Sequence, residues 1–363
     1  MKKQISARQA KAKKIPAGSM AKADTAEQNI GKGLDVGTAF IYAAQKNGNQ
    51  VSFKSQRNAF LDLEFGDFSR DILKRSDVKY IHRDNRFYVI GDDAMKFANV
   101  FGKDTRRPLQ GGVINAQEED ALPIVELIIK STLGPHRHKF EPVYYSVPGN
   151  PVDADFNTIY HENIIAEMLR GWGYNPKPIN EGLAVIYSEL LDDNFTGIGI
   201  SLGGGMANVC FANLSVPVFS FGVARGGDWI DTEVARVTNE TVSRITYIKE
   251  TKLDFTKSDI EMTKIEHALS IYYRHLIDYI LGHIKAELAQ NDKTSRLEKA
   301  IPIIVSGGTA MPKGFINLFK ESLEKIKIPL EIGDVRLASS PLHSVAKGAL
   351  VAAIADRRRT QGK

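Results

Sequence analysis

The sequence has almost no cysteine and no long apolar run. Cys210 is its single cysteine, which excludes a disulfide within the chain. It lies in an apolar, strand-like run, where we expect a small buried hydrophobic side chain. No apolar run approaches the roughly 18–20 residues of a membrane span. The basic N-terminus also lacks the apolar core of a signal peptide. We therefore expect a cytoplasmic protein.

Acidic residues are missing from the first 23 positions, which hold seven Lys and Arg. The whole chain has 48 Lys and Arg against 43 Asp and Glu, so the remainder is slightly acidic. We predict that residues 1–30 are a basic disordered tail, and that the rest is no general nucleic-acid binder. The tail is either simply solvated or attached to an anionic partner, such as the inner membrane surface, DNA or an acidic cargo adaptor.

Length and hydrophobic pattern predict two α/β domains. A chain of 363 residues exceeds what one core usually supports. A strand–turn–strand unit begins at Gly33 and another at Gly197, which indicates an internal duplication with a cleft between the halves. Apolar residues at three- and four-residue spacing predict a long helix over 263–290. Shorter strands are predicted at 80–81, 87–90, 143–147 and 301–305, and shorter helices at 123–133, 159–172, 315–323 and 345–355.

Three glycine-containing segments suggest a nucleotide site. They are Asp35–Thr38 (DVGT), Ser201–Met206 (SLGGGM) and Ser306–Met311 (SGGTAM), each beside an apolar strand-like run. Glycine after a strand lets backbone N–H groups approach an anion without a Cβ in the way. Taken alone, each segment is also consistent with an ordinary tight turn or bulge. Their order and their division between the two halves predict a nucleotide clamped between two domains.

These segments resemble the actin/heat-shock chaperone/sugar-kinase superfamily, and within it bacterial actins such as MreB. Asp35–Thr38 is similar to the first phosphate loop, Gly197–Gly205 to the second, and Ile304–Met311 to the adenosine loop in its actin form. Ile179–Ala184 resembles the connecting helix. Further similar segments are Tyr88–Ala94, Arg107–Val113 and Ser340–Gly348, so the resemblance covers about residues 33–355.

The resemblance implies a fold, cofactors and roles for single residues. The fold would be two duplicated ribonuclease-H-like domains around a cleft that holds ATP and Mg²⁺. Asp35 would hold the metal's water shell, and Glu181 would orient the attacking water; for Glu181, a helix-capping acid is the alternative. The residues implied to contact the nucleotide are Gly37, Thr38, Ser201, Gly203, Gly204, Gly205, Gly226, Gly227, Asp228, Lys249, Glu250, Gly307, Gly308 and Thr309.

The second phosphate loop departs from the family pattern. The family has an acid at the position of Ser201, and two threonines and an acid at the positions of Met206, Ala207 and Asn208. Each lost charge-assisted contact is worth about 1.5–3 kcal/mol. We therefore expect slow hydrolysis, with nucleotide binding retained.

Three function classes remain open from the sequence. The favoured one is an ATP-dependent filament protein, a self-assembling bacterial actin. A nucleotide-binding scaffold without turnover is the first alternative, and a small-molecule kinase, for which no Asp-bearing substrate motif is found, is the second. The expected domains are 31–180, with an insertion at about 55–106, and 181–355, with an insertion at about 228–300. Residues 356–363 are expected to be a basic C-terminal tail.

Overall fold

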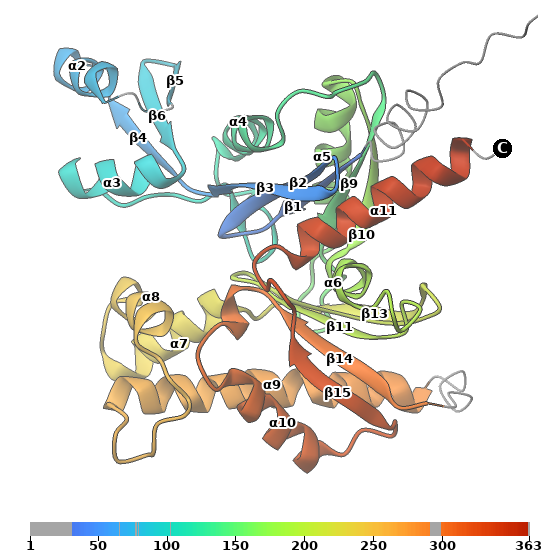
Figure 1. Cartoon of the computed structure of the whole chain (residues 1–363). Coiled ribbons are helices and arrows are strands. Elements are labelled where there is room, and N and C mark those ends of the chain that lie inside the picture. Colours follow the sequence, from blue (N-terminus) through green and yellow to red (C-terminus); the bar gives the residue numbers. More distant parts are fainter. Residues whose placement is uncertain are drawn as a thin grey trace, which may run out of the picture.

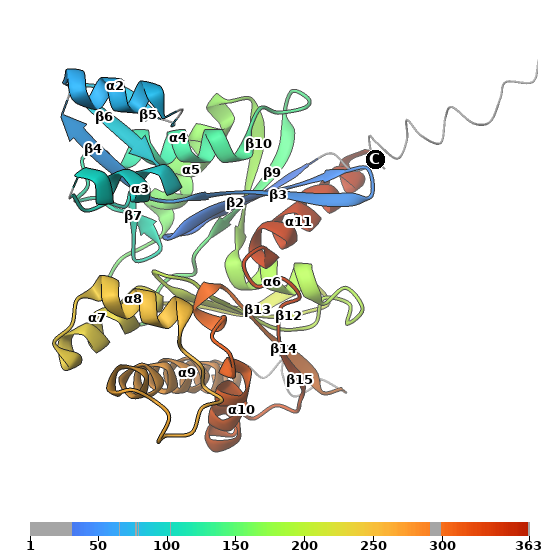
Figure 2. The same cartoon turned by 60° about the vertical axis from the view of Figure 1, so that its left-hand side comes forward.

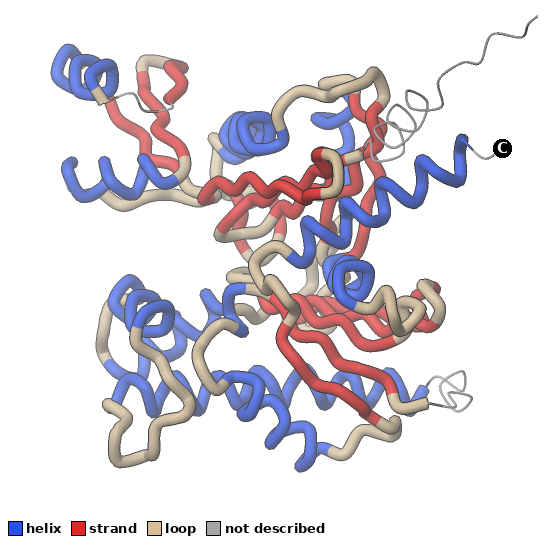
Figure 3. The backbone as a smooth tube through the Cα atoms, viewed as in Figure 1, coloured by secondary structure: helices blue, strands red, loops and turns tan. Residues whose placement is uncertain are grey.

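The computed structural model describes residues 31–361 except 65, 77, 79, 102 and 291–298. The predicted N-terminal tail lies outside the described residues. The described chain forms two lobes, each built on a five-stranded mixed sheet with helices around it (Figures 1 and 3). This α/β architecture is the fold class that the sequence predicts.

The two large sheets have the same topology. The first has the strand order β10-β9-β1-β2-β3, and the second has the order β13-β12-β11-β14-β15. In each, the first three strands in sequence are antiparallel, and two later strands add in parallel beside the first. This identity of order is what the predicted internal duplication requires. The strands are β1 Lys32–Val36, β2 Phe40–Asn47, β3 Gln50–Arg57, β9 Glu141–Val147, β10 Tyr174–Asn180, β11 Gly197–Leu202, β12 Ala207–Asn213, β13 Val216–Val223, β14 Ile301–Ser306 and β15 Ile332–Leu337.

Helices cover the outer faces of the sheets and fill the space between them. Two helices, α6 and α11, lie between the sheets, where they pack on each other and on strands of both lobes (Figures 1 and 2). The first lobe's core also buries α4 and α5, and the second lobe's core also buries α9 and α10. The bounds of these helices are α4 Ala121–Leu133, α5 Ile159–Gly171, α6 Glu181–Glu189, α9 Lys264–Gln290, α10 Phe315–Ile326 and α11 Ser344–Gln361.

Each lobe carries a smaller projection, on the same side of the molecule (Figure 1). In the first lobe a three-stranded sheet of order β4-β6-β5 has its own small core with α2 and α3. A two-stranded hairpin, β7–β8, follows it in the chain. The second lobe carries α7 and α8. The bounds are β4 Phe60–Glu64, β5 Tyr80–Arg83, β6 Arg86–Ile90, β7 Leu109–Gln110, β8 Val113–Ile114, α2 Asp67–Arg75, α3 Asp92–Phe101, α7 Gly227–Thr238 and α8 Val242–Thr251.

Local sequence explains several of these elements. Asp84 and Asn85 both have positive φ and form the turn between β5 and β6, a conformation that Asp and Asn tolerate well. All residues of β11 are buried, as expected for a central strand covered on both faces. Asn180 caps α6, its side-chain oxygen accepting from the Leu183 nitrogen at 3.2 Å.

The structure differs from the sequence-based expectations in several places. Strand β10 was not predicted, because it contains Pro176 and Pro178; it lies at the sheet edge, where the missing N–H groups are tolerated. Helix α11 continues to Gln361, past the expected start of a C-terminal tail at 356. Helix α9 lies within the insertion expected at 228–300, yet its apolar face belongs to the second lobe's core. None of the helices in the described part of the chain is long and apolar enough to cross a membrane.

Candidate nucleotide site between the lobes

The three glycine segments meet where the two lobes face each other. A Cβ placed on Gly205 would overlap the Thr38 hydroxyl, and it would lie 2.5 Å from the Gly112 nitrogen. The Thr309 hydroxyl donates to the Gly203 carbonyl at 2.8 Å. Segments that are far apart in sequence thus touch through backbone, and a side chain at Gly205 would separate them. The sequence-predicted loops are brought together at one place.

Two carboxyl groups face this junction from opposite lobes' elements. Asp35 lies on β1, and Glu181 is the first residue of α6. The Ser146 hydroxyl donates to Asp35 Oδ1 at 3.0 Å, and the Ser201 hydroxyl donates to Glu181 Oε2 at 2.9 Å. Each carboxylate therefore has a serine donor, and Ser201 directly links the second glycine loop to Glu181.

Burial governs the charge of this carboxyl pair. Burial and, after it, the nearby Glu181 carboxylate together raise the pKa of Asp35 to about 8, against the Ser146 hydrogen bond, which lowers it. Burial also raises the pKa of Glu181, against hydrogen bonds from Ser201 and Asn208 that lower it. Near neutral pH the pair therefore holds a proton. A cation bound nearby would favour the ionised carboxylates, so the pair would then release this proton.

These residues fit a magnesium–nucleotide group. Magnesium is usually held by one or two carboxylates together with phosphate oxygens and water. Among the described residues no group of three or more His, Cys, Asp or Glu side chains could hold a metal alone. Two buried carboxyl groups beside the glycine loops therefore fit a metal that binds together with the phosphates of a nucleotide.

Two residues of the second loop that depart from the family pattern contact the first lobe. The Asn208 side-chain oxygen accepts from the Gly149 nitrogen at 2.8 Å, which ties the second lobe to the loop after β9. Met206 is buried, and a Cβ on Gly112 would lie 2.5 Å from its sulfur. Both side chains thus connect the lobes, at positions where the family has an acid and a hydroxyl.

The motif Gly226–Asp228 holds the second loop through backbone hydrogen bonds. The nitrogens of Gly227 and Asp228 donate to the carbonyls of Gly203 and Gly204, at 3.0 and 2.9 Å. These amides are thus used within the protein. The Asp228 carboxylate pairs with the Arg107 guanidinium of the first lobe at 2.9 Å.

Lys249 is adjacent to the loops but is already paired. Its ammonium donates to the Gly227 carbonyl at 2.9 Å and to Asp231 at 2.7 Å, and both side chains are buried. Glu250 is exposed at the surface of α8. The structure therefore brings Lys249 to the junction and leaves Glu250 outside it.

The third segment is held by the start of α11. The Ser306 hydroxyl donates to the Pro341 carbonyl at 2.8 Å and bonds the Ser344 hydroxyl. Gly307 has a φ of 96°, in the region that favours glycine. Residues Gly308–Ala310 then form a single 3₁₀ turn. Gly37 lies in a separate turn, between β1 and β2.

Sequence reasoning missed four contributors to this site: Ser146, Gly149, Asp231 and Gly112. A serine on a buried strand and a glycine after it carry little signal of their own. Arg107 stood within a recognised segment but had no assigned role. In each case the relevant contact joins residues from different lobes, strands or helices, and spacing along the chain does not reveal it.

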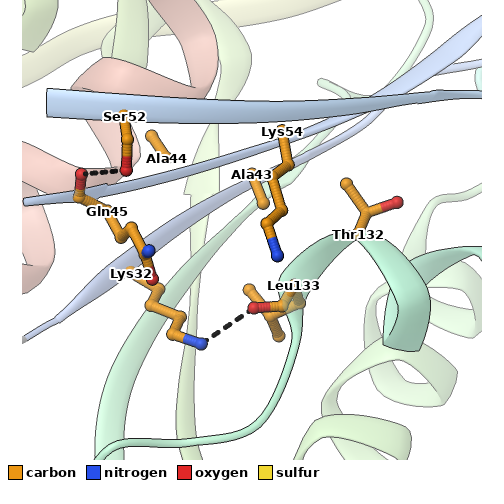
Figure 4. A pocket seen from close by; sticks show the side chains of 8 residues that line it. All are labelled: Lys32, Ala43, Ala44, Gln45, Ser52, Lys54, Thr132 and Leu133. Carbon is orange, nitrogen blue, oxygen red and sulfur yellow. Dashed lines mark hydrogen bonds between the residues drawn. The ribbon is translucent and has the colours of Figure 1, made fainter.

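A separate small cavity lies away from this junction, in the first lobe (Figure 4). It is lined by residues of β1–β3 and the end of α4. The Lys32 ammonium there donates to the carbonyls of Leu133 and Pro135 and to the Tyr174 hydroxyl. Burial lowers the Lys32 pKa to about 8. The hydrogen bonds of the Lys32 ammonium are thus satisfied within the protein, so its role there is structural.

Solved structures of MamK and MreB5 share this fold. A MamK double helical filament matches with a TM-score of 0.66 at 16% identity, over 89% of this chain and 98% of the other. MreB5 of Spiroplasma citri bound to ADP matches with a TM-score of 0.64 at 15% identity, over 93% and 100%. A non-polymerising MamK mutant bound to AMPPNP matches with a TM-score of 0.56 at 18% identity, over 90% and 98%.

The chain belongs to the Volactin family, whose model matches residues 30–353. Among curated proteins, no sequence matches significantly. The predicted resemblance to the superfamily is therefore confirmed at the level of fold.

Proposed function

We propose that this protein binds ATP with Mg²⁺ between its lobes and assembles into filaments. The observation that carries the proposal is the meeting of three glycine segments beside a buried carboxyl pair, Asp35 and Glu181. Similar structures in MamK and MreB5 include a filament and complexes with ADP or AMPPNP, which supports a nucleotide and self-assembly here.

In this proposal each group has a distinct task. Bound magnesium would neutralise phosphate charge. Asp35 would hold the metal's water shell, and the backbones of Gly37 and Gly203–Gly205 would bind the phosphates. Glu181, oriented by the Ser201 hydroxyl, polarises a water in line with the terminal phosphate. The turn at Gly307–Thr309 borders the adenosine.

Isothermal titration with ATP and Mg²⁺ tests nucleotide binding. We expect saturable one-site binding to the parent chain, and a loss of at least about 10-fold in affinity for Asp35→Ala, which removes one charge-assisted contact. Equal affinity in both proteins would overturn the assignment of the first phosphate loop.

A nucleotide-binding scaffold with little turnover is the second candidate. Ser201 and Asn208 favour it, because both stand where the family has acids and both are committed to protein partners. Single-turnover phosphate release distinguishes the two. Release that accompanies assembly supports a slow ATPase, whereas tight ATP binding without release supports the scaffold.

A further inference from the structure

An exposed ion pair crosses between the lobes at the second glycine loop, in addition to the less exposed pair of Arg225 with Asp153, 3.1 Å apart, at the loop after β9. Arg107 belongs to the first lobe and directly precedes the β7–β8 hairpin. Asp228 lies in the first turn of α7, in the second lobe. The guanidinium and carboxylate are 2.9 Å apart, and their side chains are 39% and 42% exposed. The pair is therefore accessible to solvent.

Both ends of this pair are fixed to the nucleotide loops. On the second-lobe side, the Asp228 nitrogen donates to the Gly204 carbonyl, and its carboxylate oxygens lie 3.5 and 3.6 Å from a Cβ placed on Gly204. On the first-lobe side, the hairpin tip donates from the Gly112 nitrogen to the Thr38 hydroxyl at 3.0 Å. Parting Arg107 from Asp228 would thus remove one of the links between the hairpin and the second loop.

Two further contacts between the lobes, beside this hairpin, are of a different kind. Met206 packs under Gly112, and the Gly205 backbone touches the Thr38 hydroxyl, so neither contact is an ion pair. Such contacts need close approach and vanish with a small separation. The ion pair acts over a longer range and has long, flexible side chains, so it can hold the lobes while the close contacts open.

We propose that Arg107 and Asp228 form a latch that slows nucleotide release by holding the lobes together. This rests on the proposed ATP site. Neither side chain needs to touch the nucleotide, because the pair acts by positioning the hairpin on the second loop. An exposed ion pair is weak and sensitive to salt, which suits a contact that must open in each cycle.

Stopped-flow release of a fluorescent ATP analogue, chased with excess Mg·ATP, tests the latch. At low ionic strength we expect Arg107→Ala and Asp228→Ala to release it about 2- to 5-fold faster than the parent. The charge-exchanged variant, Arg107→Asp with Asp228→Arg, should return towards the parent rate. At about 1 M salt, where screening acts within about 3 Å, the parent and single variants should converge.

Arg236→Ala is the matched control. Its partner Glu233 lies on the same helix, α7, and the pair stays within one lobe. This variant should release the analogue at the parent rate. If it too accelerates release, charge loss on α7 is responsible, and the latch is refuted.

A direct contact of Arg107 with phosphate predicts a different pattern. Arg107→Ala would then weaken binding, Asp228→Ala would not speed release, and the exchanged variant would fail to recover. That pattern would overturn the latch while leaving the ATP site intact.

Hydrogen exchange of the nucleotide-free chain separates the latch from the ATP site. Amides in 109–114 and 203–206 should exchange faster in Arg107→Ala than in the parent, and the exchanged variant should restore protection. If the parent binds no ATP but this pattern holds, the proposed function fails and the lobe contact stands. Unchanged exchange in Arg107→Ala refutes the latch.

Discussion

Glu181 and Asp35 form the chemical centre of the proposed site. Both are buried, both have raised pKa values, and each accepts a hydrogen bond from a serine. The first phosphate loop and Glu181 could be predicted from sequence, because each follows a recognisable pattern. Their serine donors could not, since Ser146 and Ser201 become partners only when strands from different parts of the chain align.

Glu181→Ala should abolish turnover with little change in ATP affinity. A water-orienting carboxylate acts mainly on the transition state, so we expect at least about a 100-fold loss in phosphate release. ATP-bound assemblies should persist longer. Glu181→Gln keeps an acceptor for Ser201 and should behave likewise. Loss of ATP binding in both variants would make Glu181 a structural residue.

Ser201→Asp tests the unusual second loop. The added carboxylate removes the donor to Glu181 and places a third acid beside the buried pair. We expect a lower melting temperature in metal-free buffer, but faster single-turnover phosphate release with Mg²⁺, because the metal gains an anchor. Ser201→Asn, which adds no charge, should not speed release. A fast parent slowed by the aspartate would refute a weakened ATPase.

The raised pKa of Asp35 makes stability depend on pH in a defined direction. Between its ordinary value of 3.8 and about 8, the folded state keeps a proton that the unfolded state loses. The free energy of unfolding therefore falls as pH rises through this window, and the loss is complete above about pH 8. Asp35→Asn removes this loss.

Chemical denaturation without nucleotide measures the effect. The stability of Asp35→Asn minus that of the parent should grow from about pH 5 to about pH 8 by up to about 4 kcal/mol, at about 1.4 kcal/mol per pH unit for one proton. Taking the difference cancels His161 and Lys32, whose pKa values burial lowers in both proteins to about 4 and about 8. A difference independent of pH would mean that Asp35 is ionised throughout.

At the scale of elements, the paired strands and the long helices could be predicted from the sequence, whereas one edge strand and two shorter helices could not. Periodicity over 263–290 matches α9, and the hairpins of both lobes match their apolar runs and turns. Strand β10 was missed because its prolines argue against a strand unless the edge position is known. Helices α7 and α8 were missed as well; they have 12 and 10 residues, against 27 in α9, so each shows fewer turns of an apolar pattern.

The packing of α11 on α6 needs glycine at one position. A Cβ on Gly348 would overlap the carbonyl oxygen of Ala184 in the backbone of α6. Gly348→Ala should therefore destabilise the protein by about 1–3 kcal/mol, despite the better helix propensity of alanine. Gly282→Ala in α9 is the matched control, because nothing lies within 4 Å of its Cβ position. It should be neutral or stabilise by up to about 1 kcal/mol. Denaturant titration of both variants measures this, and equal effects would contradict the close helix contact.

At the scale of the whole molecule, the duplicated sheets position the two halves of the site. Their common strand order places the β1–β2 turn opposite the β11–β12 turn. Sequence could predict the duplication, but not which contacts close the lobes. They include contacts of Arg107, Asn208, Met206 and Arg225, side chains whose partners lie in the other lobe.

The basic N-terminal tail should be dispensable for folding and assembly. Its seven positive charges act over roughly 8–10 Å at physiological salt, and few of its residues are apolar. Deleting residues 1–28 should leave the melting temperature and ATP affinity unchanged, while altering localisation or filament bundling. A large fall in melting temperature would show that the tail packs on the lobes.

Sedimentation of the purified chain with and without ATP and Mg²⁺ tests the central claim most directly. If nucleotide binding between the lobes drives assembly, the parent should pellet as filaments, visible by electron microscopy, only when both are present. Asp35→Ala should stay in the supernatant under the same conditions. Equal pelleting of parent and variant, with or without ATP, would contradict a nucleotide-dependent filament.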